Sequence, residues 1–318
     1  MKKWNGLVWT ILWMVLTSSS LKSDSLVLTE WMKALPDATP LCKLSIPATH
    51  DSGALLGEEG GLQTQDIDIA QQLESGIRGF DIRLRVNDCC KKLGVYHSIL
   101  YQQMTWEDNV LPAFIRFLKE HPSETLVVSM KCEGGSSSEY EEQLEKSLKD
   151  PANAPYFVQN FSADLTLGDC RGKILFLHRD EAGERYPGAL CWRWRDNATF
   201  ELVMEGSNGK NAIASIEDVY YHEDHTFATH KAELTYEHMT AAMQADPKDY
   251  KWFISYASAT ALPKAGPRAF SDVVNPWLAQ KMQGVSKNCG IVLLDFAGTA
   301  AAKELIHALI MSNEPLKK

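Results

Sequence analysis

The chain has 318 residues, of which 45% are hydrophobic, and its formal net charge at pH 7 is -9. Such an acidic chain lacks the basic face that a nucleic-acid partner requires, so we exclude nucleic-acid binding. No Pro/Gly/Ser-rich linker or block of charge divides the sequence, and its length is enough for one large core, so we expect a single folded domain.

The first residues predict a secretion signal. Lys2 and Lys3 are positively charged, residues 7–16 form an apolar run, and serines follow at 18–20. This layout is typical of a signal peptide, because a membrane-spanning helix would need about 20 apolar residues, roughly twice the length of this run. We therefore expect removal of residues 1–20, a folded domain over 21–318 and a secreted, extracellular protein.

Cysteines and sequons fit an exported chain. The seven cysteines would enter an oxidising compartment, where disulfide bonds form, and an odd number leaves at least one thiol unpaired. We do not expect the neighbours Cys89 and Cys90 to bond each other, so at least one of them should pair elsewhere. No cysteine or histidine spacing matches a zinc site. Sequons begin at Asn160 and Asn197 and predict a glycoprotein.

Short apolar, β-branched runs alternate with segments of helical period along the chain. The clearest helix covers 106–120, where Val110, Phe114 and Phe117 share one face and Thr105 with Asp108 predicts a capping box. The pattern predicts an α/β fold, a single distorted (β/α)8 TIM-like barrel, with the distortion in the long connections around 181–211. Strands are expected over 44–48, 79–84, 93–96, 125–130, 173–177, 213–216, 252–256 and 291–294, and further helices over 139–148, 235–244, 271–282 and 300–311.

Polar side chains tend to follow the predicted strands. In a parallel barrel the carboxyl ends of the strands meet at one rim, where barrel enzymes place their catalytic groups. For any single residue the simpler explanation is that a loop begins there, but the whole set favours a site. Its members are His50, Asp51, Arg83, His97, Lys131, Arg179, Asp218, Tyr220 and Asp295.

Two histidines and an arginine of this set suit phosphodiester cleavage. An unperturbed imidazole titrates near pH ~6.5, so one of His50 and His97 can take a proton from an attacking hydroxyl while the other gives one to the leaving oxygen. Arg83 lies between them in the sequence and offers a planar fork of donors that matches phosphate oxygens. The alternative for Arg83 is a structural ion pair with Asp81 or a neighbouring acid.

Three segments occur in order along the chain: 45–53 (SIPATHDSG), 79–83 (GFDIR) and 95–97 (VYH). They resemble the catalytic segments of the X-domain family of phosphatidylinositol-specific phospholipases C, in particular its smaller secreted, bacterial-type branch. Weaker similarity continues through 124–131, 216–220 and 293–296. The resemblance therefore covers nearly all of the chain after the signal segment.

The resemblance implies roles for the matching positions. His50 would be the general base that activates the inositol 2-hydroxyl, oriented by Asp295. His97 would be the general acid that protonates the departing diacylglycerol oxygen, paired with Asp51. The implied products are diacylglycerol and inositol 1,2-cyclic phosphate, and each proton transfer is worth ~10²–10⁴ in rate.

The resemblance also bears on the cofactor. Arg83 would bind the phosphate, with Asp81 as its orienting carboxylate. Calcium-dependent relatives carry an acidic metal ligand in place of Arg83 and an asparagine where this chain has Asp51. Because an arginine there supplies the charge of the cation, we expect catalysis without a metal or any other cofactor.

The resemblance places the inositol headgroup against Lys131, Arg179, Asp218 and Tyr220. Cationic and carboxylate groups suit ring hydroxyls, and an aromatic face suits the apolar side of a sugar. The match at Arg179 is ambiguous by one position, because polar residues stand on both sides of it, and its alternative is a solvated loop residue.

The expected partner is phosphatidylinositol or a glycosylphosphatidylinositol lipid, reached by transient peripheral contact with a membrane, and no protein partner is predicted. Secreted relatives often insert rim tryptophans, which the loop 54–65 lacks. The acidic surface makes attraction to anionic lipid weak. Apolar side chains of this loop and of 260–270 either insert shallowly or pack inside the domain: Leu55, Leu56, Leu262, Pro263 and Phe270.

Two other hypotheses remain open. A catalytically silent inositol-lipid-binding barrel would keep the pocket, but binding alone does not require two positioned proton carriers. A related barrel phosphodiesterase acting on a glycerophosphodiester or sphingolipid would need acidic metal ligands. Insensitivity to EDTA would argue against the second, and loss of activity with retained lipid binding after replacement of His50 would argue against the first.

Overall fold

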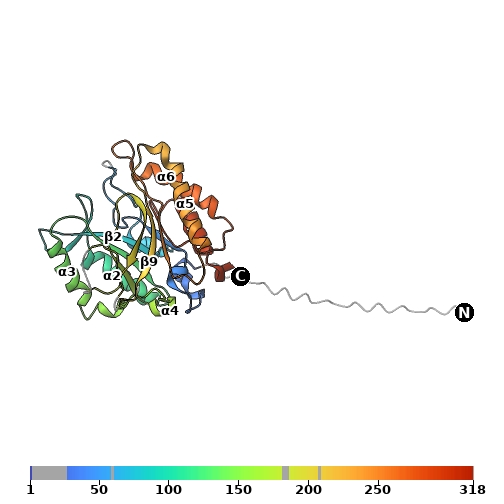
Figure 1. The fold of residues 1–318 in the computed structure, drawn as a ribbon, viewed down its shortest axis with the longest axis horizontal. Helices are drawn as coiled ribbons and strands as arrows, with labels where there is room; N and C mark the ends of the chain where they lie inside the picture. Colours follow the sequence, from blue (N-terminus) through green and yellow to red (C-terminus); the bar gives the residue numbers. More distant parts are fainter. Residues whose placement is uncertain (2–26, 59–60, 181–185, 207–208, 318) are drawn as a thin grey trace.

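The computed structural model describes residue 1 and residues 27–58, 61–180, 186–206 and 209–317. These residues form one 11-stranded sheet with helices around it (Figure 1). Residues 2–20 of the expected signal peptide lie outside the described residues, so its cleavage and the secretion of the protein stay predictions.

All eight predicted strands are present, with ends that move by at most two residues. Their buried apolar runs explain the agreement, because a strand covered on both faces reads as a continuous apolar segment. The strands are β1 (Ile46–Thr49), β2 (Gly79–Val86), β3 (Leu93–His97), β4 (Leu100–Thr105), β5 (Leu126–Cys132), β6 (Ile174–His178), β7 (Ala189–Leu190), β8 (Ala198–Met204), β9 (Ala212–Asp218), β10 (Trp252–Tyr256) and β11 (Ile291–Leu294).

The sheet curls into a nearly closed barrel. Its order is β7-β6-β5-β2-β1-β11-β10-β9-β8, and every neighbouring pair from β7 to β9 is parallel. An antiparallel bridge between Leu190 and Glu205 joins the two ends, with N–H to O distances of 2.8 and 2.9 Å. The predicted distorted (β/α)8 barrel is therefore confirmed, and its distortion lies between β6 and β9, where β7 and the antiparallel β8 replace a regular helical crossover among the described residues.

The sequence analysis missed β4, β7 and β8. In β8 the side chains of Phe200, Leu202 and Met204 are buried while their neighbours are exposed, so an alternating pattern was present but no continuous apolar run. The short β4 contains Gln102 and Gln103 and pairs only with β3. Neither strand meets the criterion of an unbroken apolar segment.

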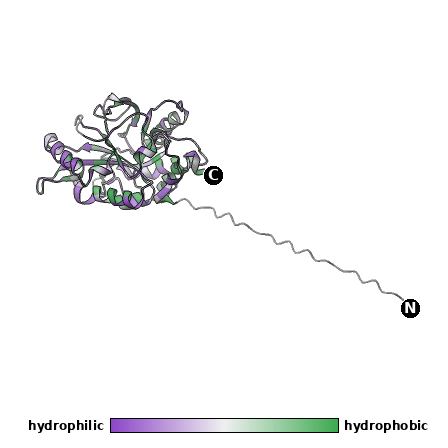
Figure 2. Ribbon diagram, turned by 90° about the horizontal axis from the view of Figure 1, so that it is seen from below, coloured by the Kyte–Doolittle hydropathy of each residue, from purple (hydrophilic) through white to green (hydrophobic). Residues whose placement is uncertain are grey.

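Helices cover the outside of the barrel, with α2 and α3 on one side and α5 and α6 on the other (Figure 1). The outer ribbon carries both hydrophilic and hydrophobic residues (Figure 2), as expected where one face packs on the sheet. All five predicted helices are present, and α5 begins seven residues earlier than predicted. The helices are α1 (Ile69–Glu74), α2 (Leu111–Glu120), α3 (Ser137–Lys149), α4 (Leu167–Cys170), α5 (Ala228–Gln244), α6 (Pro267–Met282) and α7 (Ala300–Met311).

The predicted helix over 106–120 begins with a π-helical turn, Trp106–Val110, before α2. The hydroxyl of Thr105 accepts from the Asp108 amide at 3.2 Å, as predicted. The return bond of the capping box comes from another residue, because the Thr105 amide donates to Oδ1 of Asn109 at 2.8 Å. The predicted capping box is therefore correct for the cap residue, Thr105, and wrong for the residue that returns the bond, which is Asn109 and not Asp108.

Gly79 allows β2 to approach β1 closely at the base of the site. A Cβ atom at this position would lie 2.4 Å from the Cβ of Ala48, a separation that side chains cannot adopt. The strands pair through Ala48–Gly79 and Thr49–Phe80. The glycine of the GFDIR segment therefore brings the end of β1, with His50, next to Asp81 of β2.

The expected disulfide bonds are wrong, because all seven cysteines are free thiols. Cys89 is exposed in the turn between β2 and β3, where its thiol donates to Oδ1 of Asn87 at 3.2 Å. The buried cysteines behave as small apolar residues, and burial raises the thiol pKa to about 12 in Cys170 and Cys191. The buried set is Cys42, Cys170, Cys191 and Cys289.

Candidate active site

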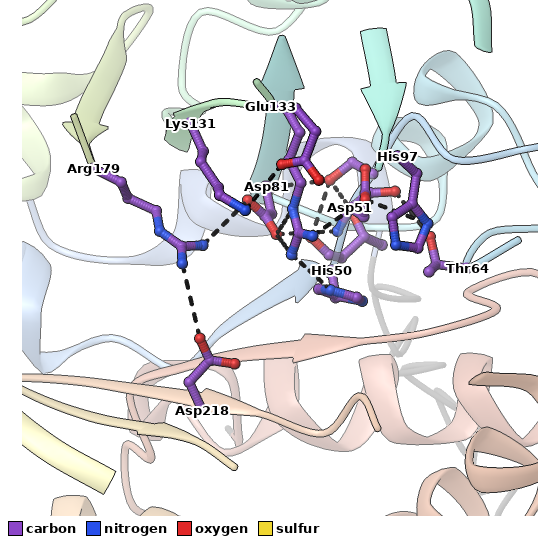
Figure 3. Close-up of polar contacts among 12 residues, drawn as sticks. His50, Asp51, Thr64, Asp81, His97, Lys131, Glu133, Arg179 and Asp218 are labelled. Carbon is purple, nitrogen blue, oxygen red and sulfur yellow. Dashed lines mark hydrogen bonds and ion pairs between the residues drawn. The ribbon is translucent and has the colours of Figure 1, made fainter. Parts of the chain in front are cut away.

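All ten predicted site residues lie together at one rim of the barrel. Figure 3 labels His50, Asp51, Asp81, His97, Lys131, Arg179 and Asp218 among them. They surround a cavity of about 230 Å³, enough for a sugar ring but far too small for lipid tails. Asp51, Asp81 and Asp295 lie beneath it and are buried. The cavity lining includes His50, Arg83, His97, Lys131, Arg179, Asp218 and Tyr220.

His50 is held by hydrogen bonds at both ring nitrogens. Its Nδ1 lies 2.9 Å from Oδ1 of Asp295, and its Nε2 lies 2.8 Å from Nη2 of Arg83. A guanidinium only donates, so Nε2 is the acceptor and Nδ1 carries the proton that is donated to Asp295. Burial and the charge of Arg83 lower the pKa of His50 well below its ordinary value. The neutral imidazole therefore presents its lone pair to the cavity side occupied by Arg83.

Arg83 is anchored by a carboxylate and still lines the cavity. Its Nε and Nη2 donate to Oδ2 of Asp81 at 3.2 and 3.0 Å, and its Nη1 lies 3.5 Å from Oδ2 of Asp51. Burial alone would raise the pKa of Asp81, but the charges of Arg83 and Arg179 hold it well below its usual range. The structural ion pair and the cavity position are therefore both present in the same arginine.

The two other carboxyl groups under the cavity are poorly satisfied. Burial raises the pKa of Asp51 to about 6 despite the nearby charge of Arg83. Burial and the charge of Asp51 raise the pKa of Asp295 well above its ordinary value. Asp51 also has a φ of 38°, a left-handed conformation that side chains other than glycine rarely adopt. Strain and buried charge together mark this turn as a functional site.

His97 faces His50 across the cavity, with the ring centroids 6.4 Å apart and the planes at 86°. Its Nδ1 lies 2.5 Å from the carbonyl oxygen of Leu62 and 3.6 Å from Oδ2 of Asp51. The expected pairing with Asp51 is therefore a loose ion-pair contact, while the carbonyl of Leu62 fixes the ring. Because the carbonyl takes the proton of Nδ1, Nε2 is the nitrogen available for chemistry.

Four groups line the side of the cavity opposite the histidines. Arg179 lies 3.9 Å from carboxylate oxygens of both Asp81 and Asp218, and its Nε and Nη1 have no hydrogen-bond partner among the described residues. Tyr220 and Lys131 complete this side. Of the neighbouring polar residues, Arg179 lines the cavity, whereas His178 is buried with its Nε2 bonded to the carbonyl of Pro187 and Asp180 accepts from the amide of Cys132.

Sequence reasoning missed four residues of the site. Trp194 stacks under the guanidinium of Arg179 at 4.1 Å and donates to Oδ2 of Asp218 at 2.9 Å. Asp196 accepts from the hydroxyl of Tyr220 at 3.0 Å. The two others are Glu133, 2.9 Å from Nζ of Lys131, and Tyr256, whose ring lies 5.9 Å from that of His50. The only signal for the first two was the alternation of arginine and tryptophan at 192–195.

Other hollows and clusters do not compete with this cavity. Larger hollows of about 770 and 870 Å³ lie elsewhere on the surface, and no histidine is among their described lining residues. Within the described ranges, no group of three or more His, Cys, Asp or Glu side chains is arranged to hold a metal ion. The guanidinium of Arg83 lines the cavity between His50 and the buried carboxylate of Asp81.

Comparison with known sequences agrees with this geometry. The sequence profile described as "Phosphatidylinositol-specific phospholipase C, X domain" matches residues 38–180. A 1-phosphatidylinositol phosphodiesterase of Listeria monocytogenes is 27% identical over 300 residues, covering 89% of this chain and 86% of the relative. The protein of the same name from Staphylococcus aureus strain Newman is 27% identical over 314 residues, covering 89% of this chain and 94% of the relative.

Solved structures show the same fold. A phosphatidylinositol-specific phospholipase C from S. aureus, studied for its membrane binding, superimposes with a TM-score of 0.78 at 25% identity and covers 90% of this chain and 99% of its own. The enzyme from L. monocytogenes superimposes with a TM-score of 0.70 at 27% identity and covers 89% of this chain and 98% of its own. Both comparisons span the whole barrel.

Proposed function

The chain belongs to the X-domain family of phosphatidylinositol-specific phospholipases C, and on this premise we propose that it cleaves phosphatidylinositol to diacylglycerol and inositol 1,2-cyclic phosphate. Lipids with a glycosylated inositol headgroup are proposed as further substrates. The observation that carries the proposal is the arrangement of charged groups around the cavity. The imidazoles of His50 and His97 face each other, and the guanidinium of Arg83 lies between His50 and two buried carboxylates.

His50 is the proposed general base. Its Nε2 lone pair already points at Nη2 of Arg83, the donor that a phosphate oxygen would engage, so a 2-hydroxyl on the same headgroup comes within reach. The pKa of His50 is lowered by burial and by Arg83, which makes the free imidazole a weak base. A bound phosphate would neutralise Arg83 and raise the basicity of His50 when the substrate is in place.

His97 is the proposed general acid. The carbonyl of Leu62 holds the Nδ1 proton, so a proton on Nε2 would face the leaving diacylglycerol oxygen. Asp51 lies 3.6 Å from Nδ1, beneath the ring. The bond from the 2-oxygen to phosphorus forms as the bond to the glycerol oxygen breaks. One proton moves to His50 and one leaves His97, and hydrolysis by a water is not required for this step.

Arg83 is the proposed phosphate ligand and supplies the positive charge at the phosphorus. Asp81 orients it through two hydrogen bonds, so the guanidinium is fixed before the substrate binds. We propose that the reaction needs no metal or other cofactor, because this fixed charge stands where a cation would otherwise be required.

Lys131, Arg179, Asp218 and Tyr220 are the proposed headgroup ligands. The free donors of Arg179 and the carboxylate of Asp218 suit the hydroxyls of an inositol ring. Trp194 holds both groups by stacking and by its indole N–H. The cavity volume of about 230 Å³ matches the headgroup and leaves the acyl chains outside, in the membrane.

The rim offers a small apolar surface for transient, peripheral contact with a membrane. Ile99, in the turn between β3 and β4, is 83% exposed, and Leu56 is 38% exposed. Of the five predicted apolar candidates, Leu56 and Pro263 are exposed, Leu55 and Leu262 are partly buried, and Phe270 packs inside with 0% exposure. No helix in the described ranges combines the length and apolarity that crossing a membrane would need. Ile99 is therefore the strongest candidate for insertion.

We further propose that the protein acts outside the cell. The N-terminal signal layout supports this proposal, and the sequon residues Asn160 and Asn197 are both exposed, so glycans can be accommodated. The free thiols do not argue against export, because four of the seven are buried.

Phosphorus NMR of the purified protein with phosphatidylinositol vesicles and a chelator tests the proposal. Growth of an inositol 1,2-cyclic phosphate signal is expected. A phosphomonoester as the first product would contradict the cyclisation mechanism, and activity that appears only on adding divalent metal would favour the metal-dependent phosphodiesterase. Lipid binding without turnover would favour the silent binding barrel.

A further inference from the structure

The segment Trp194–Asn197 is joined to the end of β9 by a row of side-chain hydrogen bonds. The antiparallel ladder between β8 and β9 ends at the pair Ala198–Asp218. Beyond this pair the backbones of the segment before β8 and the segment after β9 no longer form ladder bonds, but their side chains connect the two segments. Trp194 bonds Asp218, and Asp196 bonds Tyr220. Three of these four side chains line the cavity, and the fourth, Trp194, holds Asp218, which lines it.

Asn197 connects the same two segments by a different kind of contact. Its Oδ1 accepts from the backbone amides of both Tyr220 and Tyr221, each at 2.9 Å. One side-chain oxygen therefore takes the place of the ladder bonds that the backbone stops making at Ala198. The bonds fix the backbone of Tyr220 rather than its hydroxyl. They therefore set the position from which the aromatic side chain extends.

The backbone of Asn197 is adapted to this contact. Its φ is 45°, in the left-handed region where asparagine is among the few side chains tolerated. This conformation sits between Asp196, which lines the cavity, and Ala198, which begins β8. The turn thus needs a residue that accepts a positive φ and carries an acceptor oxygen at the same time.

We propose that Asn197 is a positioning residue for headgroup recognition: its side-chain carbonyl locks the β9 end against the 194–197 segment and thereby places Tyr220 and Asp196 at the cavity. The inference rests on the proposed function for its kinetic consequence, but not for its structural one. Because the side chain of Asn197 bonds the backbone of Tyr220 and Tyr221 and is not among the residues that line the cavity, its loss should affect binding of the headgroup more than the chemical step.

Three variants separate the two properties of Asn197, its left-handed backbone conformation and its acceptor oxygen. Asn197→Gly keeps the left-handed turn without strain and removes the acceptor. Asn197→Asp keeps both the turn and an acceptor oxygen. Lys91→Gly is the matched control, because Lys91 also has a positive φ, of 55°, and is exposed in the distant turn between β2 and β3. All proteins are made in a host without N-glycosylation, since both Asn197 variants remove the sequon.

The readouts are kcat and KM on soluble short-chain phosphatidylinositol, inhibition by myo-inositol, and hydrogen exchange of the Tyr220 and Tyr221 amides. We expect N197G to raise KM and the inhibition constant about fivefold with kcat changed less than about twofold, as for the loss of one or two exposed hydrogen bonds. Both amides should exchange faster in N197G. N197D and K91G should match the wild type in all four measurements.

Unchanged amide exchange or an unchanged inhibition constant in N197G overturns the inference, and so does an N197D variant that behaves like N197G. Should N197G fail to fold, the wild type still decides, because amides of Tyr220 and Tyr221 that exchange as fast as unstructured peptide overturn the inference without any variant. A wild type that does not cleave phosphatidylinositol refutes the proposed function instead, while amide exchange continues to test the contact.

Discussion

The two sides of the cavity differ in how firmly each holds its arginine. On the reaction side, formed by His50, Asp51, Asp81, Arg83, His97 and Asp295, four contacts of 2.8–3.2 Å link His50, Arg83, Asp81 and Asp295 into one chain. On the headgroup side, formed by Lys131, Arg179, Asp218, Tyr220 and Trp194, Arg179 stays 3.9 Å from its carboxylates and keeps free donors (Figure 3).

This difference corresponds to two kinds of work. A group that stabilises charge in a transition state must be oriented beforehand, since reorientation during the reaction would cost rate. A group that recognises hydroxyls must instead keep hydrogen-bonding capacity for its ligand, which buried polar groups normally use up within the protein. Changes on the reaction side should therefore reduce kcat, and changes on the headgroup side should raise KM.

The strongest test of the reaction side is His50→Ala. Removing the base should lower cleavage of phosphatidylinositol at least ~10³-fold, because the variant loses both general base catalysis and the imidazole that contacts Arg83. The measurement is product formation by phosphorus NMR, with vesicle binding followed in parallel. Binding should persist. The matched control is His230→Ala, whose imidazole is 56% exposed on α5, and activity retained in H50A would remove His50 from the mechanism.

Asp51→Asn tests whether the reaction side is maintained at the expense of stability. The folded pKa of Asp51 is raised to about 6, whereas an unfolded aspartate titrates near ~3.9. Protonated Asp51 therefore stabilises the fold below pH ~4, and this contribution is lost as the pH rises to about 6. At pH 8 the ionised group costs about 3 kcal/mol, so D51N should be more stable there by up to that amount.

The gain in D51N should vanish near pH 4, where the native carboxyl is already neutral, while activity at pH 7 falls because His97 loses its charged neighbour. Unfolding by urea at several pH values measures the stability difference. Asp272→Asn, at an exposed position in α6, is the control. Equal stabilisation at pH 4 and pH 8 would show that the effect is not titration of Asp51.

Asp218→Asn tests the headgroup side. Neutralising this carboxylate removes a charged acceptor for ring hydroxyls but keeps an oxygen for the indole of Trp194. We expect KM on soluble short-chain phosphatidylinositol to rise about tenfold with kcat little changed, the pattern of lost uniform binding. Glu201→Gln, exposed in β8, should have no effect. A fall in kcat without a change in KM would erase the distinction between the two sides.

The sequence predicted the reaction side better than the headgroup side, for a physical reason. His50 follows a buried parallel strand, Arg83 lies in another, and His97 ends the antiparallel strand β3, so an apolar run followed by a polar residue located them. Trp194 and Asp196 lie in an irregular connection, where no periodicity links a residue to the rim. Their partners, Asp218 and Tyr220, lie at the end of β9, and only the folded structure shows that this end is next to them.

The core of the fold was predictable for the same reason, and the failures were local. Eight strands were found from short apolar runs, most of them buried although β9 leaves Ile213 exposed, whereas β4 and β8 show no such run. The disulfide prediction failed because it relied on the compartment alone. Four of the cysteines serve as small buried residues, which their sequence neighbours did not reveal.

The smallest effect is expected at Ile99, which belongs to neither side and extends from the turn next to His97. Shallow insertion of one side chain should contribute about 1 kcal/mol, so Ile99→Ser should weaken vesicle binding about fivefold. Activity on soluble short-chain substrate should not change, because the cavity residues are untouched. Sedimentation with phosphatidylinositol-containing vesicles gives the measurement.

Val203→Ser is the matched control for Ile99→Ser, because Val203 is also exposed but pairs with Ile213, at the end of the β8–β9 ladder opposite Asp218. It should leave vesicle binding unchanged. Equal losses in both variants would mean that apolar exposure anywhere on the surface drives adsorption. A loss confined to I99S would instead show that the membrane approaches the rim from the side of His97, so that the leaving diacylglycerol oxygen meets the proposed acid at the lipid surface.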